Sequence, residues 1–178
     1  MTPDATFLAE LQAEFPAFRI VPKSASAFCR LLDVLLKVVT LGAQRRFLTH
    51  YHTVIGGTLY VPPSWEARPW QDKVVTLRHE RVHLRQFRRY GRVGMSLLYL
   101  LPILPVGLAW GRARLEWEAY AETLRATAEV LGPAAARDPR LHEHVARQFT
   151  SGAYGWMWPF PRTVRRWIAE EVARLPAA

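Results

Sequence analysis

The chain has 178 residues, of which half are hydrophobic and 22% are charged. This composition is typical of a globular protein and excludes a disordered chain, and the length suits one domain with a sizeable core. The net charge of +9 is unevenly placed, because residues 41–114 carry twelve Lys and Arg against three Asp and Glu. Basic residues gathered in this way attract phosphate, anionic lipid or acidic polypeptides. The alternative is that they form an ordinary solvated face.

The single cysteine, Cys29, excludes an intramolecular disulfide. Its neighbours are apolar, which predicts a buried, unreactive thiol. The first residues lack a basic region followed by a continuous apolar run, so no signal peptide is expected. Both features favour a reducing, cytoplasmic setting.

Apolar periodicity and helix breakers predict helices over residues 5–15, 24–41, 74–89, 112–131, 139–149 and 162–174. The second of these has a cap at Ser24 or Ser26. Two β-prone runs around Gly56-Gly57 predict a hairpin over 47–61. An aromatic loop over 152–161 is expected to close the core. The predicted fold class is therefore α+β and mostly helical.

His79-Glu80-Arg81-Val82-His83 fits the pattern H-E-x-x-H. Residues i and i+4 lie on one face of a helix, so both imidazoles can bind one Zn²⁺. The glutamate between them can take a proton from a water that zinc activates. The alternative is a pair of core histidines that donate to backbone carbonyls.

A helical wheel at about 100° per residue separates two faces of the predicted helix over 74–89. Val75, Val82 and Gln86 share the inward face with the two histidines. The opposite face, expected to contact solvent, carries Arg78, Arg81, Arg85, Arg88, Arg89 and Arg92. An ionised Glu80 near the core needs a partner, and this favours the metal site.

A catalytic zinc usually has three protein ligands, so a third is needed. One stripe of the helix over 112–131 suits a solvated ladder of ion pairs and contains Arg114, Glu118, Glu122, Arg125 and Glu129. Glu116 lies instead in the apolar arc, together with Thr123. Because a buried carboxylate is costly unless it is paired or bound to metal, Glu116 is the predicted third ligand. An ion pair with Arg112 is the alternative.

H-E-x-x-H followed by a glutamate on a second helix resembles the gluzincin metallopeptidases. Many members carry E-x-x-A-[D/N] on that helix, and Glu116-Trp117-Glu118-Ala119-Tyr120 is similar to it. Tyr120 stands where Asp or Asn is usual. A shifted match that begins at Glu118 would make Glu118 the zinc ligand.

The resemblance covers roughly residues 45–125 and implies a minimal zincin-like catalytic core. In that fold the 47–61 hairpin would pack above the active helix and offer an edge strand to an extended peptide. Residues 1–42 would form an N-terminal helical region of the same single domain, and 139–178 would form its C-terminal helices. The implied reaction is hydrolysis of a peptide bond in a protein or peptide substrate. The implied zinc ligands are His79, His83 and Glu116. The implied general base is Glu80.

Residues 93–111 carry no charge and are long enough to suggest a membrane span. A span would separate the predicted zinc ligands, so the chain is expected to turn at 101–105, with both apolar segments in the core. The alternative is a hairpin inserted into an anionic membrane surface through residues 92–114, whose flanking arginines suit lipid headgroups.

Peptidases of this class often add a Tyr or His that stabilises the oxyanion. His142, His144 and Tyr154 are candidates, with surface or packing positions as the alternative. His50 and His52 alternate in the predicted hairpin, where they would meet substrate or lie on a solvated strand face.

Two rival functions remain open at this stage. In one, the arginine face binds nucleic acid or an anionic membrane and the histidines are structural. The inward carboxylates make nucleic acid the weaker partner. In the other, the chain is a pseudo-enzyme that binds zinc without catalysis.

Overall fold

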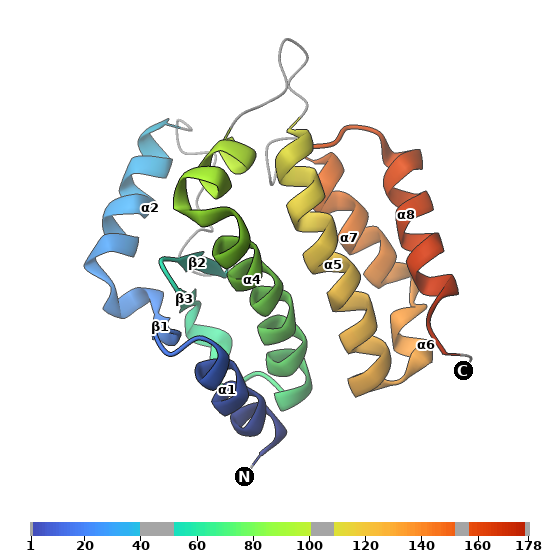
Figure 1. The fold of residues 1–178 in the computed structure, drawn as a ribbon, viewed down its shortest axis with the longest axis horizontal. Coiled ribbons are helices and arrows are strands. Elements are labelled where there is room, and N and C mark those ends of the chain that lie inside the picture. Colours follow the sequence, from blue (N-terminus) through green and yellow to red (C-terminus); the bar gives the residue numbers. More distant parts are fainter. Residues whose placement is uncertain (1, 40–51, 101–108, 152–156, 177–178) are drawn as a thin grey trace. The chain divides into compact units, whose positions relative to one another are not determined.

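The computed structural model describes residues 2–39, 52–100, 109–151 and 157–176. They are mostly helical with one small three-stranded sheet, which confirms the predicted α+β class (Figure 1). The chain divides into two compact units, Met1–Lys73 and Val74–Ala178. The residues of the predicted zinc site all belong to the second unit.

The first unit combines short helices with the sheet. Its elements are α1 (Pro3–Glu14), β1 (Arg19–Pro22), η1 (Lys23–Ala25), α2 (Ala27–Val39), β2 (Thr53–Ile55), β3 (Thr58–Val61) and η2 (Pro63–Trp65). Both predicted helices are present. The backbone N–H of Cys29 donates to Ser26 Oγ at 3.2 Å, so Ser26 caps α2. The Cys29 side chain is buried, as predicted.

The sheet has the strand order β1-β3-β2. Strands β2 and β3 form the predicted antiparallel hairpin, and Gly56 and Gly57 between them have φ of 58° and 84°, which a tight two-residue turn requires. Residues 47–51 of that prediction lie outside the described residues. Strand β1 was not predicted. It is four residues long and pairs in parallel with the distant β3, so no local pattern indicates it.

The second unit is helical. Its elements are α4 (Trp70–Leu100, which starts in the first unit), α5 (Trp110–Leu131), α6 (Pro133–Ala136), α7 (Pro139–Thr150) and α8 (Pro161–Ala173). The helices predicted over this part of the chain are confirmed, and α6 was not predicted. Gly132 ends α5 with φ of 94°, and Asp138 caps α7 by accepting the Arg140 N–H at 2.8 Å.

Helix α4 is interrupted at Gly91. This residue has φ of 66° and ψ of 173°, outside the helical region, and divides α4 into segments 70–90 and 92–100. Glycine adopts a positive φ without the steric cost that other residues bear. The first segment includes and extends the predicted helix over 74–89. The second segment contains the start of the uncharged run over 93–111.

The expectation that both parts of the uncharged run pack in the core is wrong for several residues. Met95 is buried, but Val93 is 74% exposed, Leu97 51% and Trp110 49%. The predicted turn at 101–105 lies outside the described residues. No helix among the described residues is both long and apolar enough to cross a membrane.

The core of the second unit lies where α5, α7 and α8 meet. Its buried members are Ala109, Ala113, Leu124, Val145, Ala146, Phe149, Met157, Val164 and Ile168. Trp158 stacks on Trp167 with ring centroids 6.0 Å apart. Met157 and Trp158 therefore pack on the core as predicted for the aromatic loop, whereas Phe160 is 47% exposed, and residues 152–156 of that prediction lie outside the described residues.

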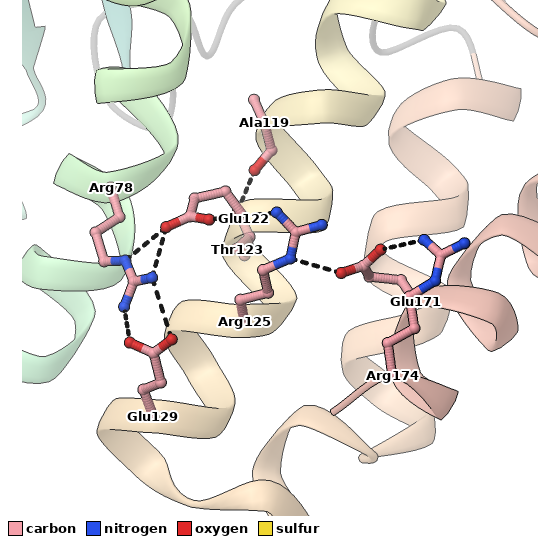
Figure 2. Close-up of polar contacts among 8 residues, drawn as sticks. All are labelled: Arg78, Ala119, Glu122, Thr123, Arg125, Glu129, Glu171 and Arg174. Carbon is pink, nitrogen blue, oxygen red and sulfur yellow. Dashed lines mark hydrogen bonds and ion pairs between the residues drawn. The ribbon is translucent and has the colours of Figure 1, made fainter. Parts of the chain in front are cut away.

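Ion pairs join α4, α5 and α8 within the second unit, as Figure 2 shows. Arg78 on α4 donates from Nε to Glu122 Oε1 on α5 at 2.7 Å and also pairs with Glu129, two turns further along α5. Arg125 on α5 donates to Glu171 Oε1 on α8 at 2.6 Å. Glu171 is buried, and it also accepts from Arg174, the residue directly after α8.

The prediction that Arg78 faces solvent is wrong, because its side chain is only 19% exposed and is held by α5. Burial and the two glutamates act in opposite directions on its pKa, and the glutamates raise it. A helical wheel assigns residues to a face, but it does not show that the basic face of α4 meets the acidic stripe of α5. These pairs fix the register of the two helices that carry the predicted zinc ligands.

Candidate metal centre

His79 and His83 on α4 and Glu116 on α5 come together in the structure. One ligand atom from each lies within 4.8 Å of the others. The two imidazole Nε2 atoms are 3.2 Å apart, and His83 Nε2 is 3.8 Å from Glu116 Oε2. The two histidines are one turn apart on one face of α4, as their spacing predicts.

The tautomer of His79 is set by Thr123. The Thr123 hydroxyl donates to the Ala119 carbonyl at 3.1 Å, one turn earlier in α5, so its hydrogen is already used. Thr123 Oγ1 must therefore accept from His79 Nδ1, which lies 3.0 Å away. His79 then carries its proton on Nδ1 and presents the lone pair of Nε2.

Gln86 orients His83 in the same way. Its Nε2 donates to the Leu115 carbonyl at 3.0 Å and to Glu118 Oε2 at 2.9 Å, and both of these groups accept hydrogen bonds. This fixes the orientation of the amide, so its Oε1, at 2.9 Å, accepts from His83 Nδ1. Gln86 is itself buried.

The consequence is a pair of Nε2 atoms that face each other and that, in the neutral form of each imidazole, both carry lone pairs. Two lone pairs at 3.2 Å repel unless a proton or a cation lies between them. Burial disfavours a charged His83, but the Glu116 and Glu80 carboxylates outweigh it and raise the pKa of His83. The electrostatic environment of these three side chains therefore favours a positive charge between them. Their donor atoms, two imidazole nitrogens and a carboxylate oxygen, are ligands that Zn²⁺ prefers.

Glu116 and Glu118 occupy different environments. Glu116 is 4% exposed and accepts a hydrogen bond from the Tyr99 hydroxyl. The Glu118 side chain is 36% exposed, accepts from Gln86, and lies 3.8 Å from Arg114. The structure therefore places Glu116 beside the histidines, whereas Glu118 contacts Gln86, which in turn contacts His83.

Tyr120 stands where the gluzincin pattern has Asp or Asn. Its ring packs edge-on against His79 with centroids 4.9 Å apart. His79 Nδ1 donates instead to Thr123 Oγ1, three residues further along α5. The ring contact and the hydroxyl of Thr123 together orient this histidine.

Glu80 is 7% exposed. Burial, with the neighbouring Glu116 charge adding to it and His83 opposing it, raises the pKa of Glu80 to about 7. A carboxyl group with a pKa near neutral can both accept and return a proton.

The other candidate residues lie elsewhere. His142 donates to the Ala136 carbonyl at 2.8 Å, and His144 is exposed on α7. His52 precedes β2 and is largely buried edge-on against Trp65, so the expected solvated strand face is wrong for it. His50 and Tyr154 lie outside the described residues.

Sequence reasoning missed three residues that shape the site: Tyr99, Gln86 and Thr123. A signal existed for the last two, because each is a polar residue within an inward-facing arc. Tyr99 reaches Glu116 only through the packing of segment 92–100 on α5, which no periodicity reveals.

Comparisons of the chain with protein-family models, with curated proteins and with solved structures found no match. The resemblance to gluzincins therefore rests on the sequence motif alone. The fold and the site define a mostly helical α+β chain with a partly buried His-His-Glu cluster.

Proposed function

We propose that this chain is a zinc-dependent metallopeptidase with His79, His83 and Glu116 as zinc ligands. The observation that carries the proposal is the approach of one ligand atom from each of these three residues to within 4.8 Å of the others, with the Glu116 carboxylate buried. Three protein ligands are typical of a catalytic zinc, which keeps another position open, whereas structural zinc sites usually have four.

Zinc bound there would activate a water and polarise the carbonyl of the scissile peptide bond. The chain supplies the proton transfer. Glu80 would take the proton of the attacking water and give it to the nitrogen of the leaving amine. Thr123 and Gln86 contact the Nδ1 atoms of the two imidazoles and so orient the Nε2 atoms toward the proposed zinc.

Nucleic-acid binding by the arginine face is the weaker alternative. Arg78 is held in ion pairs with Glu122 and Glu129 and is not free to contact phosphate. That function also gives no reason to bury Glu80 and Glu116 beside two histidines.

The test of the proposed activity is a Glu80→Gln variant, with Glu170→Gln on the exposed face of α8 as the control. Both proteins are loaded with zinc and incubated with a peptide library, and cleavage is read by mass spectrometry. Glu80→Gln should keep its zinc and lose cleavage by about 100-fold or more, because general-base catalysis contributes that much. Glu170→Gln should cleave like the wild type.

Two results would count against this activity. Unchanged cleavage by zinc-loaded Glu80→Gln would remove Glu80 from the mechanism. A wild-type protein that binds zinc but cleaves nothing in the library would favour the pseudo-enzyme.

A further inference from the structure

Three large apolar side chains lie exposed at one end of the second unit. Val93 and Leu97 are one turn apart on segment 92–100 of α4, and they are 74% and 51% exposed. Met95 on the other face of this segment is 3% exposed, so the segment packs on one side only. Trp110, the first residue of α5, is 49% exposed. Val93, Leu97 and Trp110 together form the apolar end.

Backbone packing brings these residues to the same end of the helix pair. A Cβ on Gly111 would lie 2.5 Å from the Leu98 carbonyl oxygen, so the start of α5 touches the backbone of α4 there. Arg112 Nε donates to the Tyr99 carbonyl at 3.1 Å, one residue further along each helix. Trp110, next to Gly111, therefore lies where the start of α5 meets segment 92–100 of α4.

Positive charge flanks the apolar end. Arg89 and Arg92 are exposed just before Val93, and the Arg114 side chain is 62% exposed one turn after Trp110. Residues 93–111 add no charge of either sign. Glu118, which is 3.8 Å from Arg114, is the acidic group beside it.

We propose that the apolar end docks on an anionic lipid bilayer. Val93, Leu97 and Trp110 would enter the boundary between headgroups and acyl chains, while the flanking arginines contact the lipid phosphates. The charge favours a bilayer over a second copy of this chain, because pairing two such ends would bring their arginines together. The surface is independent of the proposed zinc chemistry.

The experiment measures binding of the full chain to vesicles by flotation. One set of vesicles is phosphatidylcholine alone, and the other also contains phosphatidylglycerol. Binding should require phosphatidylglycerol and weaken as salt rises, because the arginine contribution is screened. Leu97→Asp should reduce binding by about tenfold or more, since it places a negative charge in the inserted face.

Leu131→Asp is the matched control, because Leu131 is 47% exposed at the far end of α5. It should bind vesicles like the wild type. Since both sites are exposed, thermal unfolding should show that both variants fold. Arg92→Glu tests the charged rim separately and should weaken binding to the anionic vesicles alone.

Three outcomes would overturn the proposal. In the first, folded Leu97→Asp floats with the vesicles as well as Leu131→Asp does. In the second, neutral and anionic vesicles bind equally. In the third, the chain binds neither set of vesicles and forms a dimer that Leu97→Asp dissociates. The partner of the apolar end would then be a second copy of this chain.

Discussion

Thr123 and Gln86 decide which nitrogen of each histidine is turned toward the proposed metal site. Thr123 holds the Nδ1 proton of His79, and Gln86 holds that of His83. Such outer partners fix the orientation of a ligand and commonly contribute 10- to 100-fold, as an order of magnitude, to metal affinity. The proposed site therefore depends on residues that do not touch the metal.

Replacing Thr123 with valine tests this dependence. Valine keeps the shape of the side chain but cannot accept from His79, so the zinc affinity should fall by about 10- to 100-fold. The control is Thr127→Val one turn later, whose hydroxyl donates to the Thr123 carbonyl at 2.7 Å. Competition with a chelator of known affinity measures both variants. Equal zinc affinities would contradict the assigned tautomer.

His52 gives the first unit a sensitivity to acid. Burial, with the charges of Arg68 and Lys23 adding to it, lowers the pKa of His52 from 6.5 to about 4. The folded state therefore resists protonation, and this contribution to stability is complete above pH 6.5. It is lost as the pH falls through 4, and the total loss is on the order of 3 kcal/mol.

His52→Phe should flatten the pH dependence. Phenylalanine keeps an aromatic ring against Trp65, where the wild-type centroids are 5.5 Å apart, and does not titrate. Urea unfolding at pH 7 and at pH 4.5 should show a smaller difference in the free energy of unfolding for the variant. A difference as large as that of the wild type would assign the acid sensitivity to other groups.

The residues of the site could be predicted from the sequence where the periodicity of a single helix determines which side chains face inward. The wheel placed both histidines inward and separated Glu116 from Glu118, and the structure has the same arrangement. The partners of these residues were not predictable, because each contact crosses from α4 to α5. Tyr99 is the clearest case, since its position depends on the interruption at Gly91.

At the scale of elements, the contact between segment 92–100 and α5 depends on Gly111. An added Cβ would lie 2.5 Å from the Leu98 carbonyl oxygen and 3.1 Å from its Cα, and neither atom can move without shifting the helix. At Gly94 the nearest atom is the Tyr90 Cβ at 3.3 Å. Gly111 is therefore required for close helix packing, and Gly94 is not.

Gly111→Ala and Gly94→Ala form a matched pair of substitutions. The first should lower the free energy of unfolding by about 1–3 kcal/mol, because it overpacks the helix contact. The second should leave stability unchanged or raise it by up to about 1 kcal/mol, because alanine favours the helix. Urea unfolding measures both. Equal effects would contradict the close approach of α5 to Leu98.

At the scale of the whole molecule, the helices were predictable because each carries its own periodicity and breakers. The hairpin was predictable from Gly56-Gly57, since a two-residue turn joins strands that are adjacent in sequence. Strand β1 was not, because its partner β3 is distant in sequence. The exposed apolar end was mispredicted because an uncharged run does not reveal which of its faces packs.

The measurement that tests the central claim most directly is the zinc content per chain, determined by elemental mass spectrometry on the purified, zinc-exposed protein. The account predicts about one zinc in the wild type. It predicts loss of that zinc in Glu116→Ala and retention in Glu118→Ala, because Glu116 lies with the histidines. A wild-type protein that binds no zinc would contradict the account, and loss in Glu118→Ala alone would contradict the assigned ligand.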